Sequence, residues 1–365
     1  MKLNKIIIAG GGTGGHIFPA LAIAGALNRA DETLELLFVG AKGKMEMEKV
    51  PQAGYTIVGL DIAGFNRSSL IKNIGLPWKL LKSFWQVRQV FKQFRPHAVL
   101  GVGGYSSFPV VRYAQALGIP NFLHEANSYA GRSNQLLAKK ATQVFAGVRG
   151  LEKFFPSANL CFTGNPVRTS IVHASVTAEA GRSHFGLNPL GTTLLIMGGS
   201  LGARSINKAV ESGISRLVEA GIQVIWQTGK NEEGRLLQLM KRYKGVWVGP
   251  FIQQMEFAYA AADLVVARAG ALTVAELAVV AKPVVFVPFP LAAEDHQTAN
   301  AKQLVNQQAA LLVPDSEAQQ KLIPVVLDLI KDSAQLQHMH EQLKPLGIKD
   351  ADQRVATEIL KWINA

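Results

Sequence analysis

The residues that could bind a phosphate or transfer a proton lie where apolar segments end in glycine-rich turns. Residues 6–16, IIIAGGGTGGH, contain the spacing G-x-G-x-x-G at Gly10, Gly12 and Gly15. Bare backbone at such a turn lets a phosphate approach the N-terminus of the following helix. His16 lies at the edge of the same turn, where an imidazole can accept a proton from a substrate hydroxyl. Alone, the glycine spacing is a weak signal and a single histidine is more often structural.

Two further turns in the second half have the same character. Residues 194–204, LLIMGGSLGAR, offer backbone N–H groups, the Ser200 hydroxyl and a helix dipole to a diphosphate, with Arg204 close by. Residues 268–276, RAGALTVAE, place Glu276 early in a helix, where its carboxylate can accept both hydroxyls of a ribose. A tight turn and a surface glutamate favoured by the helix dipole are the structural alternatives. Together, the turns predict a nucleotide site facing a second site across a cleft.

The elements that position these turns alternate between short β-branched runs and helical stretches, which predicts parallel sheets with helices on both faces. The first helix is expected to open at Pro19. Strands are expected at residues 5–9, 34–39, 56–61, 98–102, 121–125, 143–146, 160–163, 193–197, 223–226, 245–248, 264–267, 283–287 and 310–313. Both halves begin with a strand, a glycine turn and a helix, so one architectural unit is used twice.

The chain of 365 residues is too long for one ordinary hydrophobic core and suits two domains. Gly164, Asn165 and Pro166 interrupt both periodicities, so the boundary is placed there. Residues 1–165 form one expected α/β domain and residues 166–349 the other. The amphipathic helix at residues 350–365 is expected to pack back on the first domain.

Composition narrows the class of protein. Apolar residues make up 48% of the chain and charged residues 18%, which favours a stably folded globular protein. The single cysteine, Cys161, excludes an internal disulfide and fits a reducing cytoplasm. No segment suits a signal peptide or a membrane-spanning helix, so we expect neither export nor a transmembrane anchor.

The net charge of +12 is unevenly placed. Residues 1–165 carry 19 Lys and Arg against 8 Asp and Glu, which gives +11 and leaves +1 for the rest. Between Ala63 and His124 no acidic residue occurs. The first domain is therefore expected to meet an anionic partner, and a lipid surface attracts basic side chains at about 1 kcal/mol each.

The segment expected to form this membrane contact includes a helix over residues 78–94. Leu80, Phe84, Val87, Phe91 and Phe94 form one stripe, predicted to be core, while a second stripe lies about 120° away. The expected membrane residues are Leu70, Ile71, Lys72, Ile74, Trp78, Lys79, Leu81, Lys82 and Trp85, with Arg88 and Lys92 continuing the second stripe. The structural alternative is a wide buried helix face.

In the order of the chain, the motifs GGGTGGHIFPALAIA, GVGGYSSFP, HEANSYAGRSN, TGNPVR, GGSLGARSIN and RAGALTVAEL resemble the MurG family of bacterial peptidoglycan N-acetylglucosaminyltransferases. The resemblance implies the GT-B fold, two Rossmann-like doubly wound domains facing across a cleft. It implies transfer of N-acetylglucosamine from UDP-N-acetylglucosamine (UDP-GlcNAc) to the muramoyl 4-hydroxyl of lipid I, the undecaprenyl-diphospho-MurNAc-pentapeptide. The product would be lipid II, formed with inversion in peptidoglycan biosynthesis.

The resemblance also implies site residues. The donor-binding set is Thr13, Gly14, Gly15, Asn127, Arg168, Ser200, Ile252, Ala271, Leu272, Thr273, Val274, Ala275, Glu276 and Gln297. The acceptor-binding set is His16, Gly104, Tyr105 and Glu125, and His16 is favoured over Glu125 as general base. Alternatively, His16 binds the acceptor diphosphate. Ala126 departs from the family pattern, which expects a polar side chain there.

No cofactor is expected to be required, because UDP-GlcNAc is a substrate and no D-x-D carboxylate pair lies near the donor turns. Backbone N–H groups, a helix dipole and Arg268 are expected to stabilise the diphosphate instead, with no tightly held metal and at most loosely bound magnesium. The expected location is the cytoplasmic face of the inner membrane. The expected partners are lipid I and anionic phospholipid. Other cell-wall synthesis and division proteins are compatible with this location, and no nucleic acid is expected.

Three other classes stay open. An NAD-dependent oxidoreductase would need an acidic residue after the second strand, but that strand ends Phe38-Val39-Gly40-Ala41-Lys42. A UDP-sugar epimerase of the same fold would share the donor turns without needing a basic membrane face. A non-catalytic peripheral membrane protein would explain the basic charge and leave the donor turns unused.

Overall fold

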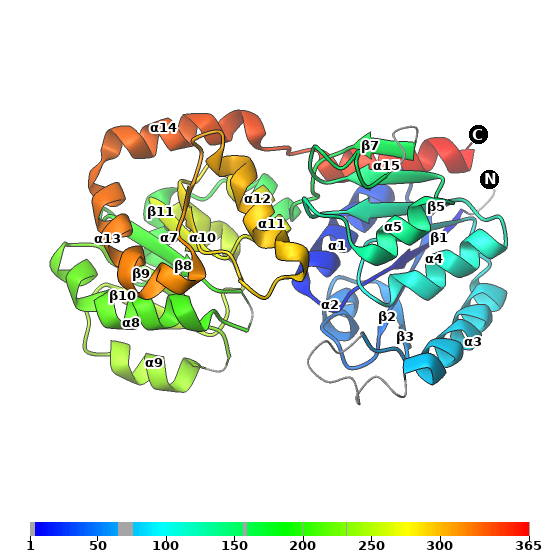
Figure 1. Ribbon diagram of the computed structural model, residues 1–365, viewed down its shortest axis with the longest axis horizontal. Helices are drawn as coiled ribbons and strands as arrows, with labels where there is room; N and C mark the ends of the chain where they lie inside the picture. Colours follow the sequence, from blue (N-terminus) through cyan, green and yellow to red (C-terminus); the bar gives the residue numbers. More distant parts are fainter. Residues whose placement is uncertain (1–3, 65–75, 156–158, 200, 231, 365) are drawn as a thin grey trace. The chain divides into compact units, whose positions relative to one another are not determined.

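The computed structural model describes residues 4–64, 76–155, 159–199, 201–230 and 232–364. The chain divides into two compact units, Met1–Arg168 with Lys349–Ala365, and Thr169–Ile348. We call them unit 1 and unit 2 (Figure 1). Each unit is a parallel sheet covered by helices, the arrangement that the alternation of apolar runs and helical segments predicts.

Unit 1 contains a seven-stranded sheet in the order β3-β2-β1-β4-β5-β6-β7, with every neighbouring pair parallel. Its strands are β1 Lys5–Ala9, β2 Glu35–Ala41, β3 Thr56–Leu60, β4 Ala98–Gly101, β5 Asn121–Glu125, β6 Gln143–Ala146 and β7 Leu160–Phe162. The strand order reverses between β1 and β4. In a doubly wound sheet, ligands bind beyond the carboxyl ends of the strands at this point.

Two apolar layers enclose this sheet. The helices of unit 1 are α1 Gly14–Ala30, α2 Glu46–Gln52, α3 Leu76–Phe94, α4 Ser107–Ala116, α5 Arg132–Ala138 and α15 Ala351–Asn364. Alternate strand residues such as Ile6, Ile8 and Phe122 pack with α1 and α15 on one face. Ile7, Leu123 and their neighbours pack with α3, α4 and α5 on the other. Both faces are apolar, as expected for a fully covered parallel sheet.

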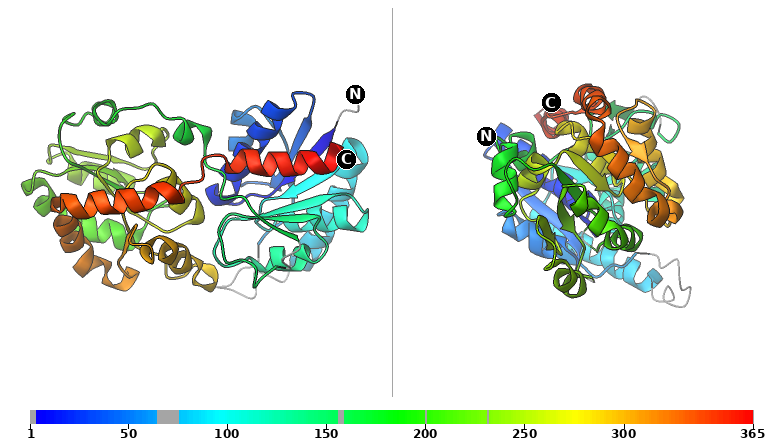
Figure 2. Two further views of the ribbon diagram at one scale, coloured as in Figure 1. Left: turned by 90° about the horizontal axis from the view of Figure 1, so that it is seen from above. Right: turned by 90° about the vertical axis from the view of Figure 1, so that its left-hand side faces the viewer.

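The last helix, α15, returns the chain to unit 1 after unit 2 is complete. Figure 2 shows it, in red, beside the blue N-terminal elements, and it contacts α1. Val355, Ala356 and Ile359 are buried in the layer that α1 also enters. Asp352 accepts a hydrogen bond from the Arg29 guanidinium at 2.8 Å.

Unit 2 repeats the topology with six parallel strands in the order β10-β9-β8-β11-β12-β13. They are β8 Thr193–Met197, β9 Gln223–Gln227, β10 Val246–Gly249, β11 Leu264–Ala267, β12 Val284–Phe286 and β13 Leu311–Leu312. The helices are α6 Thr169–Val172, α7 Ala178–His184, α8 Arg204–Glu219, α9 Glu233–Met240, α10 Met255–Ala261, α11 Ala271–Val279, α12 His296–Val305, α13 Ala318–Lys331 and α14 Ser333–Leu343. The order now reverses between β8 and β11, so the described residues that follow these two strands lie at the ligand-binding edge.

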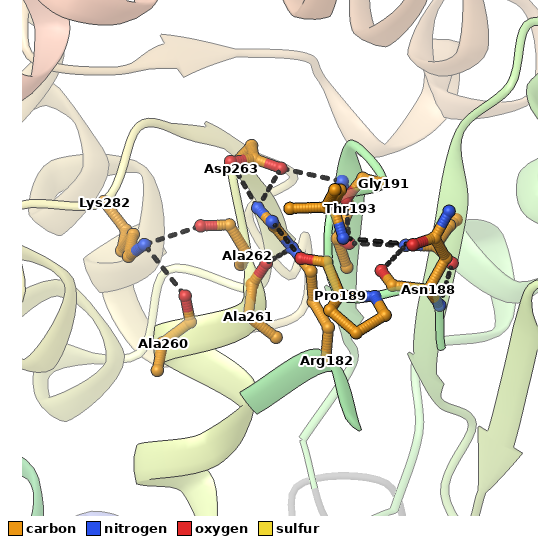
Figure 3. Close-up of polar contacts among 12 residues, drawn as sticks. Arg182, Asn188, Pro189, Gly191, Thr193, Ala260, Ala261, Ala262, Asp263 and Lys282 are labelled. Atoms are coloured by element: carbon orange, nitrogen blue, oxygen red, sulfur yellow. Dashed lines mark hydrogen bonds and ion pairs between the residues drawn. The ribbon is translucent and has the colours of Figure 1, made fainter. Parts of the chain in front are cut away.

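A polar network around the buried Arg182 ties α7 to the amino ends of the strands of this sheet (Figure 3). The Arg182 guanidinium donates to both carboxylate oxygens of Asp263 at 3.0 Å and to the carbonyl oxygen of Ala261 at 3.2 Å. Asp263 in turn accepts from the backbone N–H of Thr193 at 2.8 Å. Burial lowers the pKa of Lys282, whose ammonium donates to the Ala262 carbonyl at 2.6 Å. These contacts fix the amino ends of β8 and β11, away from the candidate site.

The expected strands are present within one or two residues, but the expected start of the first helix is wrong. α1 begins at Gly14, and Pro19 lies inside it. The backbone N–H groups of His16 and Ile17 both donate to the carbonyl oxygen of Thr13, so the helix is established before the proline. His16 is therefore a residue of the first helical turn.

Candidate functional site

The glycine turn after β1 is held by a buried carboxylate that the sequence motifs do not reveal. Glu46, 1% exposed, accepts hydrogen bonds from the backbone N–H of Gly12 at 2.9 Å and of Ala41 at 3.0 Å. A Cβ atom at Gly11 would collide with this carboxylate. Gly12 itself has φ +91°, a left-handed conformation that favours glycine. The turn is therefore preorganised, with Glu46 joining the ends of β1 and β2.

His16 is oriented by the same turn. Its Nδ1 atom lies 3.2 Å from the carbonyl oxygen of Gly11 and 3.3 Å from the hydroxyl of Thr13. A proton on Nδ1 donated to the Gly11 carbonyl puts the imidazole lone pair on Nε2, the state that a general base requires. A Cβ atom at Gly103 would lie 2.7 Å from the imidazole ring, so the turn after β4 must be glycine for the ring to fit.

The turn after β4 lies directly against the turn after β1. Gly104 has φ +80°, and a Cβ atom there would collide with the Gly11 carbonyl. The Tyr105 ring lies within 4 Å of the space beside Gly12. The structure thus brings His16, Gly104 and Tyr105, predicted separately from two motifs, to one place at the reversal point of the sheet.

Glu125 ends β5 and is 4% exposed. One carboxylate oxygen accepts from the backbone N–H of Asn127 at 3.1 Å and from its side-chain amide at 3.3 Å. The other accepts at 2.9 Å from the backbone N–H of Gly131 and the amide of Asn134. Four donors therefore engage this carboxylate, which orders the loop between β5 and α5. Such engagement favours a positioning role over proton transfer, and Asn127 belongs to the same network.

Next to Glu125 in β5, His124 is buried with no hydrogen bond to either ring nitrogen. The pKa of His124 is lowered to about 4, mainly by burial and to a smaller extent by the positive charge of a protonated His16. The backbone of Gly164 offsets part of this shift, although its geometry falls short of a hydrogen bond. The ring is therefore neutral at physiological pH. Sequence reasoning missed His124, which has only its place beside Glu125 as a signal.

Several residues assigned to the donor lie in unit 1. Thr13, Gly14 and Gly15 form the start of α1, and Thr13 is its N-cap residue. Arg168 is the last residue of unit 1 before the chain enters unit 2. Its guanidinium lies 4.8 Å from the centre of the Phe18 ring. A cation–π contact of this kind fixes the arginine against α1.

In unit 2, the glycine turn after β8 packs against the end of β9. A Cβ atom at Gly202, which has φ +80°, would collide with the Thr228 carbonyl. Leu201 is 75% exposed. Arg204, the first residue of α8, is exposed and has no ion-pair partner within the described ranges. Ser200, predicted for the donor, lies outside the described residues.

Residues 271–276 form the N-terminal part of α11, capped by Gly270. Their backbone N–H groups begin a helix at the reversal point of the sheet, where an anion is stabilised. Glu276 is 7% exposed, and one of its carboxylate oxygens accepts a hydrogen bond of 2.8 Å from the Tyr259 hydroxyl. Glu276 lies in the second turn of α11 and is more buried than a glutamate on the protein surface would be.

Ile252 was expected to contact the uracil through its backbone. In the structure its N–H donates to the Oε1 atom of Gln227 at 2.9 Å, and both side chains are buried. The carbonyl of Ile252 is the backbone group left for a base. Gln227 ends β9 and carried no sequence signal, because nothing in the chain pattern links it to a loop 25 residues away.

Arg268 already has several partners within unit 2. Its guanidinium forms an ion pair with Asp315 and donates to the carbonyl oxygens of Val287 and Pro288 at 2.9 and 3.0 Å. A further bond of 3.1 Å reaches the Ser205 hydroxyl. The ion-paired Arg268 side chain therefore joins the loop after β12 to the start of α8. That Arg268 serves the diphosphate stays a prediction, and Arg204, exposed at the start of α8, is a further cation there.

Gln297 lies in the first turn of α12, after a strained loop. Glu294 and Asp295 have φ +49° and +51°, a left-handed backbone that costs non-glycine residues about 1 kcal/mol or more each. The Gln297 Oε1 atom accepts from the backbone N–H of Phe289 at 2.9 Å. Its amide group therefore has a defined orientation, with the NH₂ end available as donor.

The described part of the expected membrane face is exposed. Trp78 is 78% exposed, and Leu81 and Trp85 are each 61% exposed. The alternative of a wide buried helix face is therefore wrong for these residues. Lys79 is also exposed, whereas Lys82 forms an ion pair with Asp61 at 3.0 Å. Leu70, Ile71, Lys72 and Ile74 lie outside the described residues.

The expected core stripe of α3 is confirmed for Phe84, Val87, Phe91 and Phe94, which are buried or partly buried. Leu80, near the start of the helix, is the exception at 37% exposed. Within the described ranges, no helix combines the length and apolar character needed to span a bilayer. The same ranges contain no cluster of three or more His, Cys, Asp or Glu suited to a metal ion.

Comparison with known proteins extends over nearly the whole chain. The glycosyltransferase family 28 N-terminal domain matches residues 6–146, and the family 28 C-terminal domain matches residues 193–355. The UDP-N-acetylglucosamine--N-acetylmuramyl-(pentapeptide) pyrophosphoryl-undecaprenol N-acetylglucosamine transferase of Bacteroides fragilis is 45% identical over 361 residues, covering 98% of this chain and 95% of the relative.

Solved structures agree with the two-unit architecture. Acinetobacter baumannii MurG has a TM-score of 0.76 at 30% identity, covering 98% of this chain and 99% of that one. A putative UDP-N-acetylglucosamine 2-epimerase from Listeria monocytogenes has a TM-score of 0.72, covering 97% of this chain and 95% of that one. At 15% identity, the epimerase shares the fold alone. Both units therefore have the Rossmann-like architecture of GT-B proteins.

Proposed function

The chain belongs to glycosyltransferase family 28, and on that basis we propose that it transfers N-acetylglucosamine from UDP-GlcNAc to lipid I, forming lipid II. The observation that carries this proposal is 45% identity, over almost the full length of both chains, to a relative named for that reaction. The epimerase alternative is not favoured, because its likeness lies at 15% identity.

The chemistry requires a base for the attacking hydroxyl. The muramoyl 4-oxygen forms a bond to C1 of the donor sugar as the bond from C1 to the diphosphate oxygen breaks, and UDP leaves with that electron pair. Attack opposite the leaving group inverts C1. The proton of the hydroxyl goes to the His16 Nε2 atom, because the hydrogen bond from Nδ1 to Gly11 sets the ring in the accepting tautomer.

Glu125 acts as a positioning residue in this scheme. Its four hydrogen bonds order the loop that contains Asn127, beside the turns that hold His16 and Tyr105. A carboxylate occupied in this way stabilises a loop more readily than it accepts a proton. Gly104 and Tyr105, next to the His16 turn, are proposed to contact the acceptor.

The donor site is assigned to the carboxyl edge of the unit 2 sheet. The N-terminus of α11 and the turn after β8 supply N–H groups to the diphosphate, Glu276 accepts from the ribose and Gln297 contacts the sugar. Arg204 supplies the nearby positive charge. Because these groups stabilise the negative charge on the leaving diphosphate, the proposed reaction requires no tightly held metal.

We also assign a membrane-docking role to α3. The exposed aromatic side chains Trp78 and Trp85, with Leu81 between them, suit the interfacial region of a bilayer. An acceptor with an undecaprenyl chain has to be met at such a surface, which gives the proposed location at the cytoplasmic face of the inner membrane. Other cell-wall synthesis proteins fit this location as partners.

The decisive experiment measures UDP release from UDP-GlcNAc with and without a short-chain lipid I analogue. A transferase releases UDP only with the acceptor and yields the disaccharide lipid. Consumption of UDP-GlcNAc at the same rate without any acceptor would instead indicate an epimerase or hydrolase. A rise in melting temperature with UDP but not with NAD tests the nucleotide class independently.

A further inference from the structure

The carboxylate of Glu46 is a buried negative charge close to the proposed base. Its Oε2 atom accepts from the backbone N–H of Gly12 at 2.9 Å, and its Oε1 atom accepts from the backbone N–H of Ala41 at 3.0 Å. The side chain is shielded from water, and no basic side chain in the described ranges pairs with it. Two peptide N–H groups therefore do for this charge what a cation or solvent would otherwise do.

One of these N–H groups belongs to the same peptide group that contacts His16. The N–H of Gly12 and the carbonyl of Gly11 are the two polar groups of a single trans peptide, so they point in opposite directions. Glu46 accepts at the N–H end of this peptide. At the other end, the carbonyl oxygen lies 3.2 Å from the Nδ1 atom of His16. Carboxylate, peptide and imidazole thus form one hydrogen-bonded chain.

The neighbouring glycines leave room for this chain. A Cβ atom at Gly11 would lie 2.3 Å from the Oε1 atom of Glu46. A Cβ atom at Gly104 would lie 2.4 Å from the Gly11 carbonyl oxygen, so a side chain there would cover the acceptor. A Cβ atom at Gly40, in β2, would lie 2.5 Å from the Cγ atom of Glu46. Three strand ends therefore provide the space in which the carboxylate reaches the peptide.

The negative charge of Glu46 decides between two tautomers of His16. Hydrogen-bonded groups in a chain polarise one another where the dielectric is low, so a carboxylate on the N–H makes the Gly11 carbonyl a stronger acceptor. That carbonyl can only accept and requires a proton on Nδ1. The Thr13 hydroxyl, 3.3 Å from the same Nδ1 atom, can accept or donate and is compatible with either tautomer. Glu46 therefore shifts the balance towards the form with its lone pair on Nε2.

We propose that Glu46 is a positioning residue that acts on His16 through the peptide between Gly11 and Gly12, an inference that rests on the proposed role of His16 as general base. Glu46 selects the tautomer that can accept a proton at Nε2. It also stabilises the imidazolium that forms when Nε2 takes the proton of the attacking hydroxyl. In serine proteases an aspartate bonded directly to the histidine has this role, whereas here one peptide group lies between them. Glu46 neither takes a proton nor contacts a substrate.

The test removes the charge of Glu46 and keeps its shape. Glu46→Gln can still accept one of the two hydrogen bonds. Glu48→Gln removes a carboxylate from an exposed position of the same helix, α2, and is the matched control. Gly40→Ala is a second variant, because its Cβ displaces the Glu46 side chain and leaves the carboxylate in the protein. It replaces Glu46→Gln if circular dichroism shows that this variant does not fold.

Nitrogen-15 NMR of labelled histidine reports which ring nitrogen has the proton, and His16→Ala identifies the signal. At about pH 8, where an imidazole of ordinary pKa is neutral, His16 of the parent should have its proton on Nδ1. In Glu46→Gln a fraction of the proton should move to Nε2, whereas Glu48→Gln should keep the parental pattern. A proton on Nε2 in the parent, or a parental pattern in Glu46→Gln, would overturn the inference.

Turnover with a short-chain lipid I analogue measures the consequence for the reaction. Glu46→Gln should lower kcat roughly tenfold, as expected for one charge-assisted hydrogen bond, with the KM for the acceptor and the affinity for UDP close to parental. A raised KM with parental kcat would show that Glu46 only shapes the glycine turn.

The same experiment separates this inference from the proposed function. If the parent releases no UDP with the acceptor, the transferase function fails, and the NMR comparison still tests the contact between Glu46 and His16. If the parent is active and His16→Ala is not, a parental kcat and tautomer in Glu46→Gln reject the role of Glu46 alone.

Discussion

The Tyr259 hydroxyl donates a hydrogen bond of 2.8 Å to the Glu276 carboxylate in the interior of unit 2. The bond occupies one oxygen and fixes the side chain for the ribose. Glu276→Gln replaces a charge-assisted acceptor, so the affinity for UDP should fall by roughly 1.5 to 3 kcal/mol. Tyr259→Phe should reduce it less. Calorimetry gives both values, and an unchanged affinity for a lipid I analogue is the control. UDP binding as tight as the parent's in Glu276→Gln would exclude the ribose role.

His16→Ala should lower turnover by at least about a hundredfold while the affinity for UDP-GlcNAc stays intact, because it removes the base and leaves the donor site untouched. Glu125→Gln provides the comparison. It should weaken acceptor binding together with turnover, since the amide cannot accept the bonds from Asn127, Gly131 and Asn134 in the same way. Near-parental turnover in His16→Ala would transfer the base role to Glu125. A loss confined to acceptor binding would assign His16 to the acceptor diphosphate.

Trp78→Ser with Trp85→Ser should weaken binding to anionic vesicles without loss of fold, because both side chains are more than half exposed. Co-sedimentation measures the binding and circular dichroism the fold. Salt should weaken but not abolish binding of the parent, since screening removes only the Coulombic part. A double variant that sediments with vesicles as the parent does would rule out this face.

The buried His124 predicts an acid-sensitive fold. Its pKa in the folded protein is about 4, below the value near 6.5 of an unfolded chain, so the unfolded state binds a proton first as pH falls. The free energy of unfolding should therefore decrease by up to about 3 kcal/mol between pH 6.5 and about 4 from this residue. Urea unfolding at several pH values measures the slope. His124→Leu should show a shallower slope, and an identical slope would remove His124 as the cause.

Turnover should persist in excess chelator, because N–H groups and Arg204 are proposed to stabilise the leaving diphosphate. Arg204→Gln should lower turnover and UDP affinity, whereas Lys208→Gln, exposed one turn later on α8, should change neither. Complete loss of turnover in chelator, restored by magnesium, would contradict a metal-independent reaction.

The strands and their turns were predictable because apolar β-branched runs end at glycine, as at β1 and β8. The proximity of His16, Gly104 and Tyr105 also followed, since parallel strands bring their carboxyl ends to one edge. The start of α1 was misplaced because proline is common in a first turn and the earlier bonds to Thr13 leave no mark in the sequence.

Side-chain partners far apart in the chain were not predictable. Glu46 reaches the glycine turn across 34 residues, and Arg268 meets Asp315 across 47. Residue type identified Arg268 as a cation near a phosphate-binding turn, but the carboxylate that neutralises it comes from a separate element. Electrostatics depend on which side chains the fold brings together, and local patterns do not contain that information.

The return of α15 to unit 1 sets an order of events during synthesis. All of residues 169–348 leave the ribosome before the segment that completes the layer around α1, including Asp352 and Ile359. Unit 2 can therefore mature as a continuous stretch, while α1 waits with an apolar face and Arg29 without its partner. Unit 1, although most of it is synthesised first, is therefore the last unit to complete its fold.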